Sequence, residues 1–352
     1  MSDGADSPLV SFDHEELVVR KGRRSGAYTV VAVHSTALGP ALGGCRMWRY
    51  ESSAAGARDA LRLAWAMTFK AAAAGVPLGG GKGVICADPG RAPSGKRRRD
   101  MLLDFADTVN ALEGRYVTAE DVGTSARDMA IIARGTKHVT GLARTRGGSG
   151  DPSPFTALGV EAAIRACCAK RFGSRELKGR TVAIVGAGRV GSNLARRLSR
   201  AGARLIVADI DASKRDVVKK LSGARWAEPS KALTADVDVL SPCALGGAID
   251  PTTIAHLRCK VVCGSANNQL AHEGLAEDLA AHDILYAPDF IANAGGLINI
   301  AVELEGYDPA RARRRAVAIE QTMALVLEQA EADGVTPVEA AYDVARARLA
   351  HN

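Results

Sequence analysis

Aromatic residues are scarce in this 352-residue chain and make up 4% of it. The cores of two ordinary domains must therefore consist mostly of Ala, Val, Leu and Ile. The basic clusters at 96–99 and 311–315 contain no aromatic residue on which a base could stack. We interpret the net charge of +7 as solvated surface, and we expect no nucleic-acid partner.

Several other signals are also missing. No apolar run is long enough to span a membrane, and residues 1–8 are polar, unlike a signal peptide. The seven cysteines include no Cys-x-x-Cys pair, and the seven histidines form no His-Glu-x-x-His motif. We therefore expect no membrane partner and no metal, and we interpret the cysteines as buried thiols of a cytoplasmic protein.

Three consecutive glycines precede Lys82 in the stretch 76–85. This is not a phosphate-binding loop, because the earlier glycine is misplaced and Gly83 stands where Ser or Thr is required. The absence of side chains at 79–81 predicts that a ligand can approach this backbone closely. Lys82 is therefore a candidate catalytic group.

Two further charged residues belong to the same part of the chain. Lys70 lies in the otherwise uncharged stretch 64–78, where a lysine has to be partly buried, and Asp121 follows a short strand predicted at 115–118. Burial and a second ammonium group both lower the pKa of a lysine, which would make Lys82 a base at neutral pH. The spacing alone does not show that these three side chains meet.

The pattern of elements predicts two α/β domains with a cleft between them. The first contains a hairpin, two long helices and short strands, and a loop rich in glycine is expected at 34–46. A Gly/Ser/Pro stretch at 145–154 predicts a hinge. Beyond it, strands alternate with helices, which predicts a parallel, doubly wound sheet. The expected strands lie at 181–185, 204–209, 237–241, 260–263 and 284–286.

We assign residues 1–143 to a substrate and catalytic domain and residues 144–333 to a Rossmann-type NAD-binding domain. One long helix is expected over 309–332. The last segment, 334–352, contains an amphipathic helix that we expect to pack back on the first domain.

Gly186-x-Gly188-x-x-Gly191 follows an apolar strand, precedes a helix, and has Asp209 at the end of the next strand. This context is the dinucleotide-binding fingerprint, in which the glycines permit a tight turn, close approach of the pyrophosphate and close helix packing. A carboxylate at 209 would accept the ribose hydroxyl groups and repel a 2′-phosphate, which predicts NAD. Arg215 could partly offset that charge.

The sequence resembles the Glu/Leu/Phe/Val amino-acid dehydrogenase family, and within it the leucine and valine branch. The resemblance runs in family order from about residue 27 to the C-terminus, so it is highly specific. It implies reversible, NAD-dependent oxidative deamination of an L-amino acid to a 2-oxo acid and ammonia. The matching stretches are 34–44, 67–70, 78–82, 116–124, 186–191, 244–247, 266–270 and 286–296.

The resemblance also implies residue roles. Lys82 activates the attacking water, Asp121 moves protons to and from the amino nitrogen, and Lys70 binds the substrate carboxylate. The other residues implied to hold the substrate are Gly43, Gly44 and Asn268. Those implied to hold the cofactor are Gly186, Gly188, Arg189, Val190, Gly191, Asp209, Thr156, Cys243, Ala244 and Asn268.

The positions implied to surround the substrate side chain are Leu42, Ala119, Leu297 and Ile300. All are apolar, so no charge is available for the carboxylate of a glutamate side chain. Leu297 and Ile300 lie three residues apart on one predicted helix and leave less room for a phenyl ring. We therefore expect leucine, isoleucine and valine as substrates, with phenylalanine as the alternative.

Two points stay open at this level. A protein that kept the fold but lost the chemistry, an NAD sensor, is a remote alternative that retention of Lys70, Lys82 and Asp121 disfavours. The family implies a cytoplasmic homo-oligomer, and the sequence does not choose between a dimer and an octamer.

Overall fold

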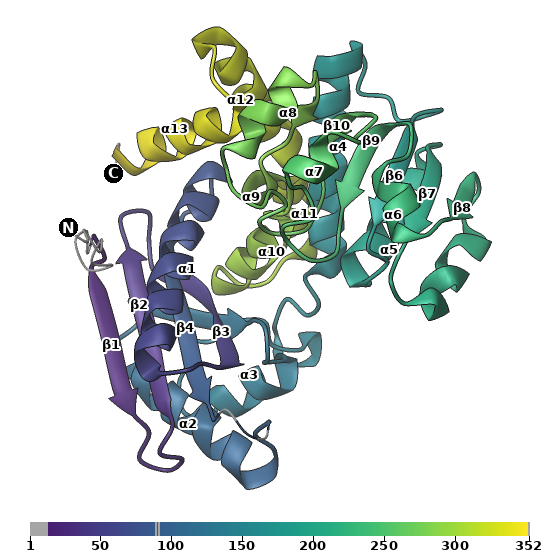
Figure 1. The fold of residues 1–352 in the computed structure, drawn as a ribbon. Coiled ribbons are helices and arrows are strands. Elements are labelled where there is room, and N and C mark those ends of the chain that lie inside the picture. Colours follow the sequence, from purple (N-terminus) through teal and green to yellow (C-terminus); the bar gives the residue numbers. More distant parts are fainter. Residues whose placement is uncertain (1–12, 89, 91, 351–352) are drawn as a thin grey trace, which may run out of the picture. The chain divides into compact units, whose positions relative to one another are not determined.

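The computed structural model describes residues 13–88, 90 and 92–350 (Figure 1). The polar segment 1–8 lies outside the described residues. Contacts between Cα atoms divide the described chain into two units, residues 13–71 with 77–142, and residues 72–76 with 143–350. Both units are α/β, which confirms the predicted fold class. The expected cleft and the separate roles of the domains stay predictions.

The sheet of the first unit has the strand order β1-β2-β4-β3-β5. β1 and β2 form an antiparallel hairpin, β2 pairs antiparallel with β4, and β3 pairs parallel with both β4 and β5. The strands are β1 (Glu16–Lys21), β2 (Tyr28–Ser35), β3 (Ala41–Arg49), β4 (Gly79–Ala87) and β5 (Tyr116–Glu120). The helices are α1 (Ser53–Ala73), α2 (Gly95–Asn110) and α3 (Ala126–Ile132).

Helices cover this sheet on both faces (Figure 1). Val30 and Ala32 of β2 pack with Ala64 of α1, whereas the alternate residues Val31 and Val33 belong to the core formed with α2 and α3. Successive side chains of a strand point to opposite faces, so one strand contributes to both cores. The first unit is therefore a three-layer arrangement with α1 alone on one side.

The glycine-rich segments of the first unit are strands, which corrects the sequence analysis. It expected a loop at 34–46 and a strand only from residue 84. A Cβ atom on Gly80 would overlap Thr68 of α1, and one on Gly83 would overlap the ring of Phe105 of α2. Glycine in a strand interior permits such close approach. The expectation that the glycines at 79–81 leave the backbone open to a ligand was wrong, because a Cβ atom on each of them would overlap protein atoms, those of Ser35, Thr68 and Tyr116 respectively.

The second unit contains a parallel sheet with the order β11-β10-β9-β6-β7-β8. The chain proceeds from β6 outward to β8 and then returns to β9 on the other side of β6. The strand order reverses there, and such a switch point is where doubly wound sheets bind ligands. The strands are β6 (Thr181–Val185), β7 (Arg204–Ala208), β8 (Ala224–Trp226), β9 (Val237–Pro242), β10 (Cys259–Val262) and β11 (Leu285–Tyr286).

Helices surround this second sheet, and the segment expected as one helix over 309–332 is interrupted at Ala318. The α-helices are α4 (Ser153–Phe172), α5 (Arg189–Arg200), α6 (Pro229–Leu233), α7 (Pro251–Ile254), α8 (Leu275–Ala281), α9 (Asp289–Ala292), α10 (Gly295–Leu304), α11 (Pro309–Val317), α12 (Ile319–Asp333) and α13 (Pro337–Ala350). Short 3-10 helices are η1 (Arg144–Arg146) and η2 (Ala212–Lys220).

The contacts between Cα atoms group the last helix, α13, with the second unit. Arg348 of this helix also donates to the carbonyl groups of Ala72 and Ala73 at the end of α1, at 2.8 and 2.7 Å, and the expected packing of α13 on the first domain stays a prediction. Val338 is buried in the core of the second unit. The hydroxyl group of Tyr342 donates to Glu273 at 2.6 Å, and its ring stacks on Phe290 with centroids 5.1 Å apart. The helical pattern showed an apolar face but did not specify the surface that covers it.

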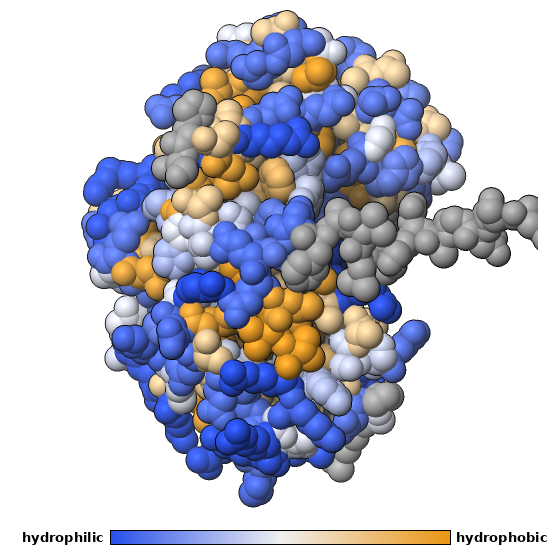
Figure 2. Space-filling view, turned by 90° about the vertical axis from the view of Figure 1, so that its left-hand side faces the viewer, coloured by the Kyte–Doolittle hydropathy of each residue, from blue (hydrophilic) through white to orange (hydrophobic). Residues whose placement is uncertain are grey.

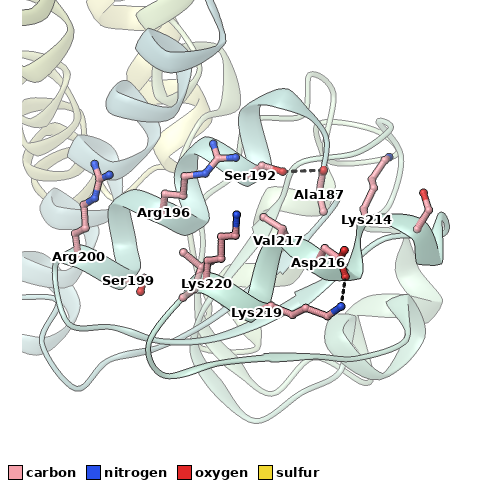
Figure 3. Close-up of a pocket in the computed structure, with 12 residues that line it drawn as sticks. Ala187, Ser192, Arg196, Ser199, Arg200, Lys214, Asp216, Val217, Lys219 and Lys220 are labelled. Carbon is pink, nitrogen blue, oxygen red and sulfur yellow. Dashed lines mark hydrogen bonds and ion pairs between the residues drawn. The ribbon is translucent and has the colours of Figure 1, made fainter.

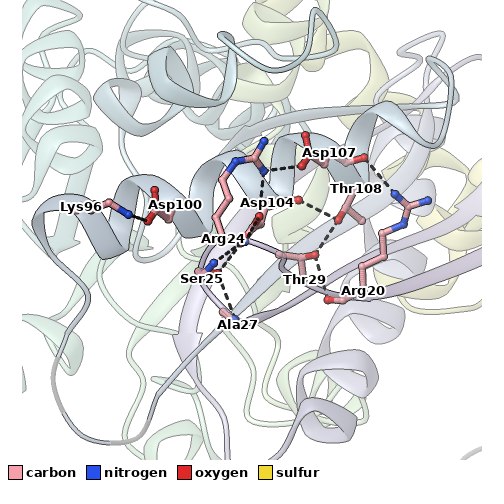
Figure 4. A network of polar contacts seen from close by, with 10 residues as sticks. All are labelled: Arg20, Arg24, Ser25, Ala27, Thr29, Lys96, Asp100, Asp104, Asp107 and Thr108. Carbon is pink, nitrogen blue, oxygen red and sulfur yellow. Dashed lines mark hydrogen bonds and ion pairs between the residues drawn. The ribbon is translucent and has the colours of Figure 1, made fainter.

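A buried carboxylate ties the β1–β2 hairpin to α2 (Figure 4). Asp104 is 3% exposed. One of its oxygens accepts the backbone N–H of Arg24 at 3.1 Å and its guanidinium at 3.0 Å. The other oxygen accepts the N–H and hydroxyl groups of Ser25 at 2.8 and 2.7 Å. A carboxylate with this many donors stays ionised and fixes the turn.

Asp104→Ala should lower the free energy of unfolding of the first unit by about 3 kcal/mol, because it leaves the turn amides and Arg24 without their acceptor. Urea unfolding and hydrogen exchange at the β1–β2 amides would measure the loss. Asp107→Ala is the matched control, since Asp107 binds the same guanidinium but is 48% exposed and should cost less than about 1 kcal/mol. Equal losses in both variants would contradict this account.

Candidate active site

The predicted pair Lys82 and Asp121 is in direct contact. Lys82 lies on β4 and Asp121 directly follows β5, and the ammonium nitrogen is 2.7 Å from Asp121 Oδ2. Lys82 pairs across the sheet with Ala32, whose side chain belongs to the core beneath α1. The Lys82 side chain is therefore enclosed between sheet and helix, and it is 7% exposed.

Burial lowers the pKa of Lys82, and the nearby carboxylate of Asp121 opposes that shift. Desolvation raises the pKa of Asp121, but the charge and hydrogen bond of Lys82, together with the charge of Arg46 and a backbone hydrogen bond from Val122, outweigh it and the pKa is lowered overall. The cation that lowers the pKa of Lys82 most is Arg46. The sequence had instead suggested that the ammonium group of Lys70 would have this effect. The pair thus combines an ionised acceptor with an amine that loses its proton more readily than an ordinary lysine.

Residues predicted to hold the substrate in this unit lie on the same sheet. Leu42 pairs with Gly80 and Val117, and Gly44 pairs with Ala119. A Cβ atom on Gly44 would lie 2.7 Å from the Cβ atom of Asp121, so the missing side chain makes room for the carboxylate.

Gly43 lies in the same strand, and its carbonyl accepts the hydroxyl group of Tyr116 at 2.6 Å. A Cβ atom at 43 would overlap the backbone of Gly81. Packing therefore requires glycine at both 43 and 44, and their roles toward a substrate stay predictions.

Lys70 lies half-buried on α1, in the same unit as Lys82 and Asp121. Two residues before it, Thr68 packs directly against Gly80, which is itself two residues before Lys82. The last turns of α1 are therefore held against the strand that carries Lys82. The contribution of Lys70 to substrate binding stays a prediction.

Arg46 and Asp59 are charged neighbours of this pair that the sequence analysis missed. Arg46 Nε donates to Asp121 Oδ2 at 3.1 Å, and Arg46 Nη1 donates to Asp59 Oδ2 at 2.9 Å. The signal that could have found Arg46 is alternation: Leu42, Gly44 and Arg46 share one face of a strand that was expected to be a loop.

The glycine fingerprint of the second unit lies at the switch point between β6 and β9. Gly186 has φ +114°, and a Cβ atom there would lie 2.6 Å from the backbone of Cys243. A Cβ atom on Gly191 would overlap the carbonyl of Gly186. A Cβ atom on Gly188 would meet no atom within 4 Å, so open space remains at the N-terminus of α5, as pyrophosphate binding requires.

Arg189 and Val190 form the first turn of α5, exposed and half-buried respectively. Asp209 follows β7, and its oxygens accept the N–H groups of Ala187 at 2.7 Å and Asp211 at 2.9 Å. Lys214 contacts both oxygens, at 3.0 and 3.1 Å. The cation that offsets Asp209 is thus Lys214, and not Arg215, which is exposed.

A positively charged groove of about 680 Å³ adjoins this carboxylate, between α5 and η2 (Figure 3). Asp216 within it is bound to Lys219 at 2.6 Å, so it neutralises only one cation. The remaining positive charge favours the anionic part of a dinucleotide. Its basic lining residues are Arg196, Arg200, Lys214, Lys219 and Lys220.

The other predicted cofactor residues of the second unit follow β9 and β10. Cys243 binds Val185 through its N–H group at 2.7 Å and is followed by exposed Ala244. Asn268 is exposed and has φ +51°, a left-handed conformation uncommon outside glycine, and its carbonyl accepts Gly247 N–H at 2.7 Å. These loops meet at the same end of the parallel sheet.

Thr156 lies on α4, and a Cβ atom on Gly296 would be 2.6 Å from its hydroxyl oxygen. This contact places Thr156 beside the first turn of α10, which carries Leu297 and, one turn on, Ile300. Leu297 is buried and Ile300 half-buried. In the described part of the chain, no group of three or more His, Cys, Asp or Glu side chains lies where it could hold a metal ion.

Comparison with known proteins identifies related sequences over nearly the whole chain. Residues 13–138 match the family described as Glu/Leu/Phe/Val dehydrogenase, dimerisation domain, and residues 206–352 match Glutamate/Leucine/Phenylalanine/Valine dehydrogenase. Residues 161–246 match the NAD binding domain of D-isomer specific 2-hydroxyacid dehydrogenase. The dinucleotide site built from the glycine fingerprint therefore fits NAD.

Individual proteins that are similar to this chain belong to the same group of amino-acid dehydrogenases. A leucine dehydrogenase of Bacillus subtilis is 44% identical over 341 residues, which covers 97% of this chain and 93% of the relative. A valine dehydrogenase of Streptomyces albus is 44% identical over 346 residues, covering 96% and 92%. The crystal structure of L-tryptophan dehydrogenase from Nostoc punctiforme has a TM-score of 0.86 and 38% identity and covers 96% of each chain.

Gly188→Ala should fold normally and bind NADH at least about tenfold more weakly, because its methyl group enters space that is open in the protein. Fluorescence titration with NADH would measure binding, and thermal unfolding would measure stability. Gly191→Ala is the matched comparison, since its methyl group would overlap protein atoms and should destabilise the second unit. Unchanged NADH affinity in Gly188→Ala would remove this glycine from the cofactor site.

Proposed function

The chain belongs to the Glu/Leu/Phe/Val dehydrogenase family, and we propose on that basis how its residues carry out NAD-dependent oxidative deamination of branched-chain L-amino acids. The products are the 2-oxo acid, ammonia and NADH, and the reaction is reversible. The observation that carries the assignment of roles is the buried contact between Lys82 and Asp121 at 2.7 Å.

Lys82 and Asp121 manage the protons of this reaction. The α-amino group must be neutral before the α-carbon can lose a hydride, and Asp121, an ionised acceptor, takes up its proton. Loss of the hydride from the α-carbon leaves an iminium ion, and water attacks its carbon while the neutral amine of Lys82 removes a proton from that water. Asp121 then returns its proton to the nitrogen of the carbinolamine. The C–N bond breaks to release ammonia, and the hydroxyl group loses its proton to solvent and becomes the carbonyl of the 2-oxo acid. A lowered lysine pKa serves this role because only the neutral amine is a base.

Lys70 binds the substrate carboxylate by charge pairing, which fixes the α-carbon relative to Lys82. NAD, when bound, accepts the hydride. The residues that would hold NAD belong to the second unit: the glycines of the fingerprint at the pyrophosphate, and Asp209 at the ribose. To accept ribose hydroxyl groups, the Asp209 oxygens would exchange their contacts with Lys214.

The substrate side chain is branched and aliphatic. Leu42 and Ala119 are buried, apolar and on the sheet of the catalytic pair, and Leu297 in the second unit is likewise apolar. The names of the relatives from Bacillus and Streptomyces, leucine and valine dehydrogenase, agree with this chemistry. An aromatic L-amino acid is the second candidate substrate, because the solved relative from Nostoc is named for tryptophan.

The protein forms a homo-oligomer through its first unit. That unit matches a family part described as a dimerisation domain. Hydrophobic side chains gather on its surface, surrounded by hydrophilic ones (Figure 2), and an apolar patch of this kind is typical of an interface.

A cytoplasmic location is supported by the seven cysteines, which are all free thiols, as expected in a reducing compartment. Among the described residues, every helix is too short or too polar to cross a membrane.

Leucine, valine and isoleucine should each give NADH from NAD⁺ at alkaline pH, with kcat/KM at least about tenfold above those of phenylalanine and glutamate. Pockets of this kind discriminate poorly among aliphatic chains, since one methylene changes binding by only ~1–3 kcal/mol. Absorbance of NADH with each amino acid measures the preference. A preference for phenylalanine or tryptophan would select the aromatic alternative, and inactivity with all of them would favour an NAD sensor.

Lys82→Met should lower kcat for deamination by about 10³-fold while leaving NADH binding unchanged, because methionine fills the space but cannot take up a proton. In the wild type, kcat/KM should rise with pH and level off below 10.5, because burial lowers the pH at which Lys82 becomes neutral. Lys96→Met, which alters a lysine that is 89% exposed on α2, is the control. Persistence of turnover in Lys82→Met would refute this mechanism.

A further inference from the structure

The Lys82–Asp121 pair is one end of a chain of charged side chains that extends away from it. Arg46 on β3 contacts Asp121 through Nε at 3.1 Å and Asp59 through Nη1 at 2.9 Å. The side chains of Arg46 and Asp59 are 22% and 17% exposed, so both are largely shielded from water. The proton transfers assigned above involve neither residue directly.

Asp59 is itself held in place from two further sides. The hydroxyl group of Tyr50 donates to Asp59 Oδ2 at 2.6 Å, and Arg62 donates to Asp59 Oδ1 at 2.9 Å. Asp59 lies on α1, which also carries Lys70, whereas Arg46 lies on β3. The guanidinium of Arg46 is therefore clamped between a helix residue and the catalytic carboxylate, with one nitrogen on each.

This arrangement restricts the orientation of Asp121. Lys82 and Arg46 both contact the same oxygen, Oδ2, from different strands. On the other side, the Cβ atom of Asp121 lies against the backbone at Gly44. Two fixed donors on one oxygen and a close backbone contact leave the carboxylate little freedom to rotate.

Arg46 also acts on the charge of the pair. A guanidinium stays protonated throughout the usable pH range, so its field favours ionised Asp121 and neutral Lys82. The charge of Asp59 acts on Lys82 in the opposite direction and raises its pKa. Burial raises the pKa of Cys45 and Tyr50, so neither becomes charged near neutral pH. Among the described residues, the other ionisable groups that interact electrostatically with the pair are Arg46 and Cys45 on β3, Asp59 on α1 and the buried Tyr116 on β5.

We propose that Arg46, held by Asp59, is a positioning residue that fixes the Asp121 carboxylate against Lys82 and keeps Lys82 available as a base. This inference rests on the deamination mechanism given above. It adds to that mechanism an electrostatic control that neither catalytic residue provides by itself.

The test compares Arg46→Gln, Arg46→Lys and Asp59→Asn with the wild type. The kcat and KM of leucine deamination are measured from pH 7 to 11, with NADH affinity by fluorescence and stability by thermal unfolding. Arg49→Gln is the matched control, because Arg49 is an exposed arginine on the same strand. Wild-type activity is established first, so that failure of the deamination proposal is distinguished from failure of this one.

In Arg46→Gln, kcat should fall by about 10²-fold, as expected for a displaced catalytic group, with NADH affinity unchanged. The pH at which kcat/KM levels off should move upward, because a cation that favours neutral Lys82 is gone. In Asp59→Asn, the pH at which kcat/KM levels off should move downward, because an anion that favours protonated Lys82 is gone. Arg46→Lys keeps the charge but cannot span both carboxylates, so its pH profile should stay near that of the wild type while kcat falls.

Opposite displacements in the Arg46→Gln and Asp59→Asn variants are the signature of the proposal, since a purely structural role would not produce them. Profiles that superimpose on that of the wild type, in variants that fold and bind NADH, would overturn it. If Arg46→Gln does not fold, Arg46→Lys and Asp59→Asn still decide: an unchanged pH profile and kcat in both variants would refute the role of Arg46.

Discussion

The burial of one charged side chain, that of Lys82, is the constraint on which the first unit depends. An ammonium group enclosed between a sheet and a helix is costly unless an opposite charge lies close by. Asp121 supplies that charge at 2.7 Å, and Arg46 and Asp59 continue the alternation of sign outward to the surface. Removing any member leaves its neighbours with an unbalanced charge in a partly dehydrated space. The same dehydration lowers the pKa of the lysine, as the proposed role of a base requires, so in that proposal stability and catalysis impose opposite requirements on one residue.

Glycine serves two different purposes in the two units. In the first unit, Gly80 and Gly83 let helices pack directly on the strand that carries Lys82, and no room for a ligand remains above them. In the second unit, Gly186 and Gly191 allow the turn between β6 and α5 to pack closely against neighbouring backbone, whereas Gly188 faces open space. A glycine-rich motif therefore does not by itself indicate a ligand. What distinguishes Gly188 is the space left by its neighbours.

In the mechanism we propose, each sheet carries one part of the reaction. The mixed sheet of the first unit holds a buried acid–base pair, which requires helices on both faces to exclude water. The parallel sheet of the second unit presents loops at the ends of its strands, where the N-terminus of α5 and exposed backbone groups suit an extended anionic cofactor. The chain belongs to a family of dehydrogenases that contains both parts, the one with the Lys82–Asp121 pair and the one with the dinucleotide site.

The sequence by itself determined the features that depend on local order. The fingerprint from Gly186 to Asp209 lies within one strand–helix–strand unit, so its spacing alone indicated a dinucleotide site. Resemblance over nearly the whole chain singled out Lys82 and Asp121 as candidate catalytic residues, whose roles stay predictions. Tertiary structure decided the rest. Strand β3 and the glycine-rich first half of β4 were missed because glycine disfavours strands unless neighbouring segments pack closely against them. No local pattern encodes how distant segments pack. This packing decides which surface α13 covers, and it brings Arg46 into contact with Asp59 and with Asp121, which is 75 residues away in the sequence.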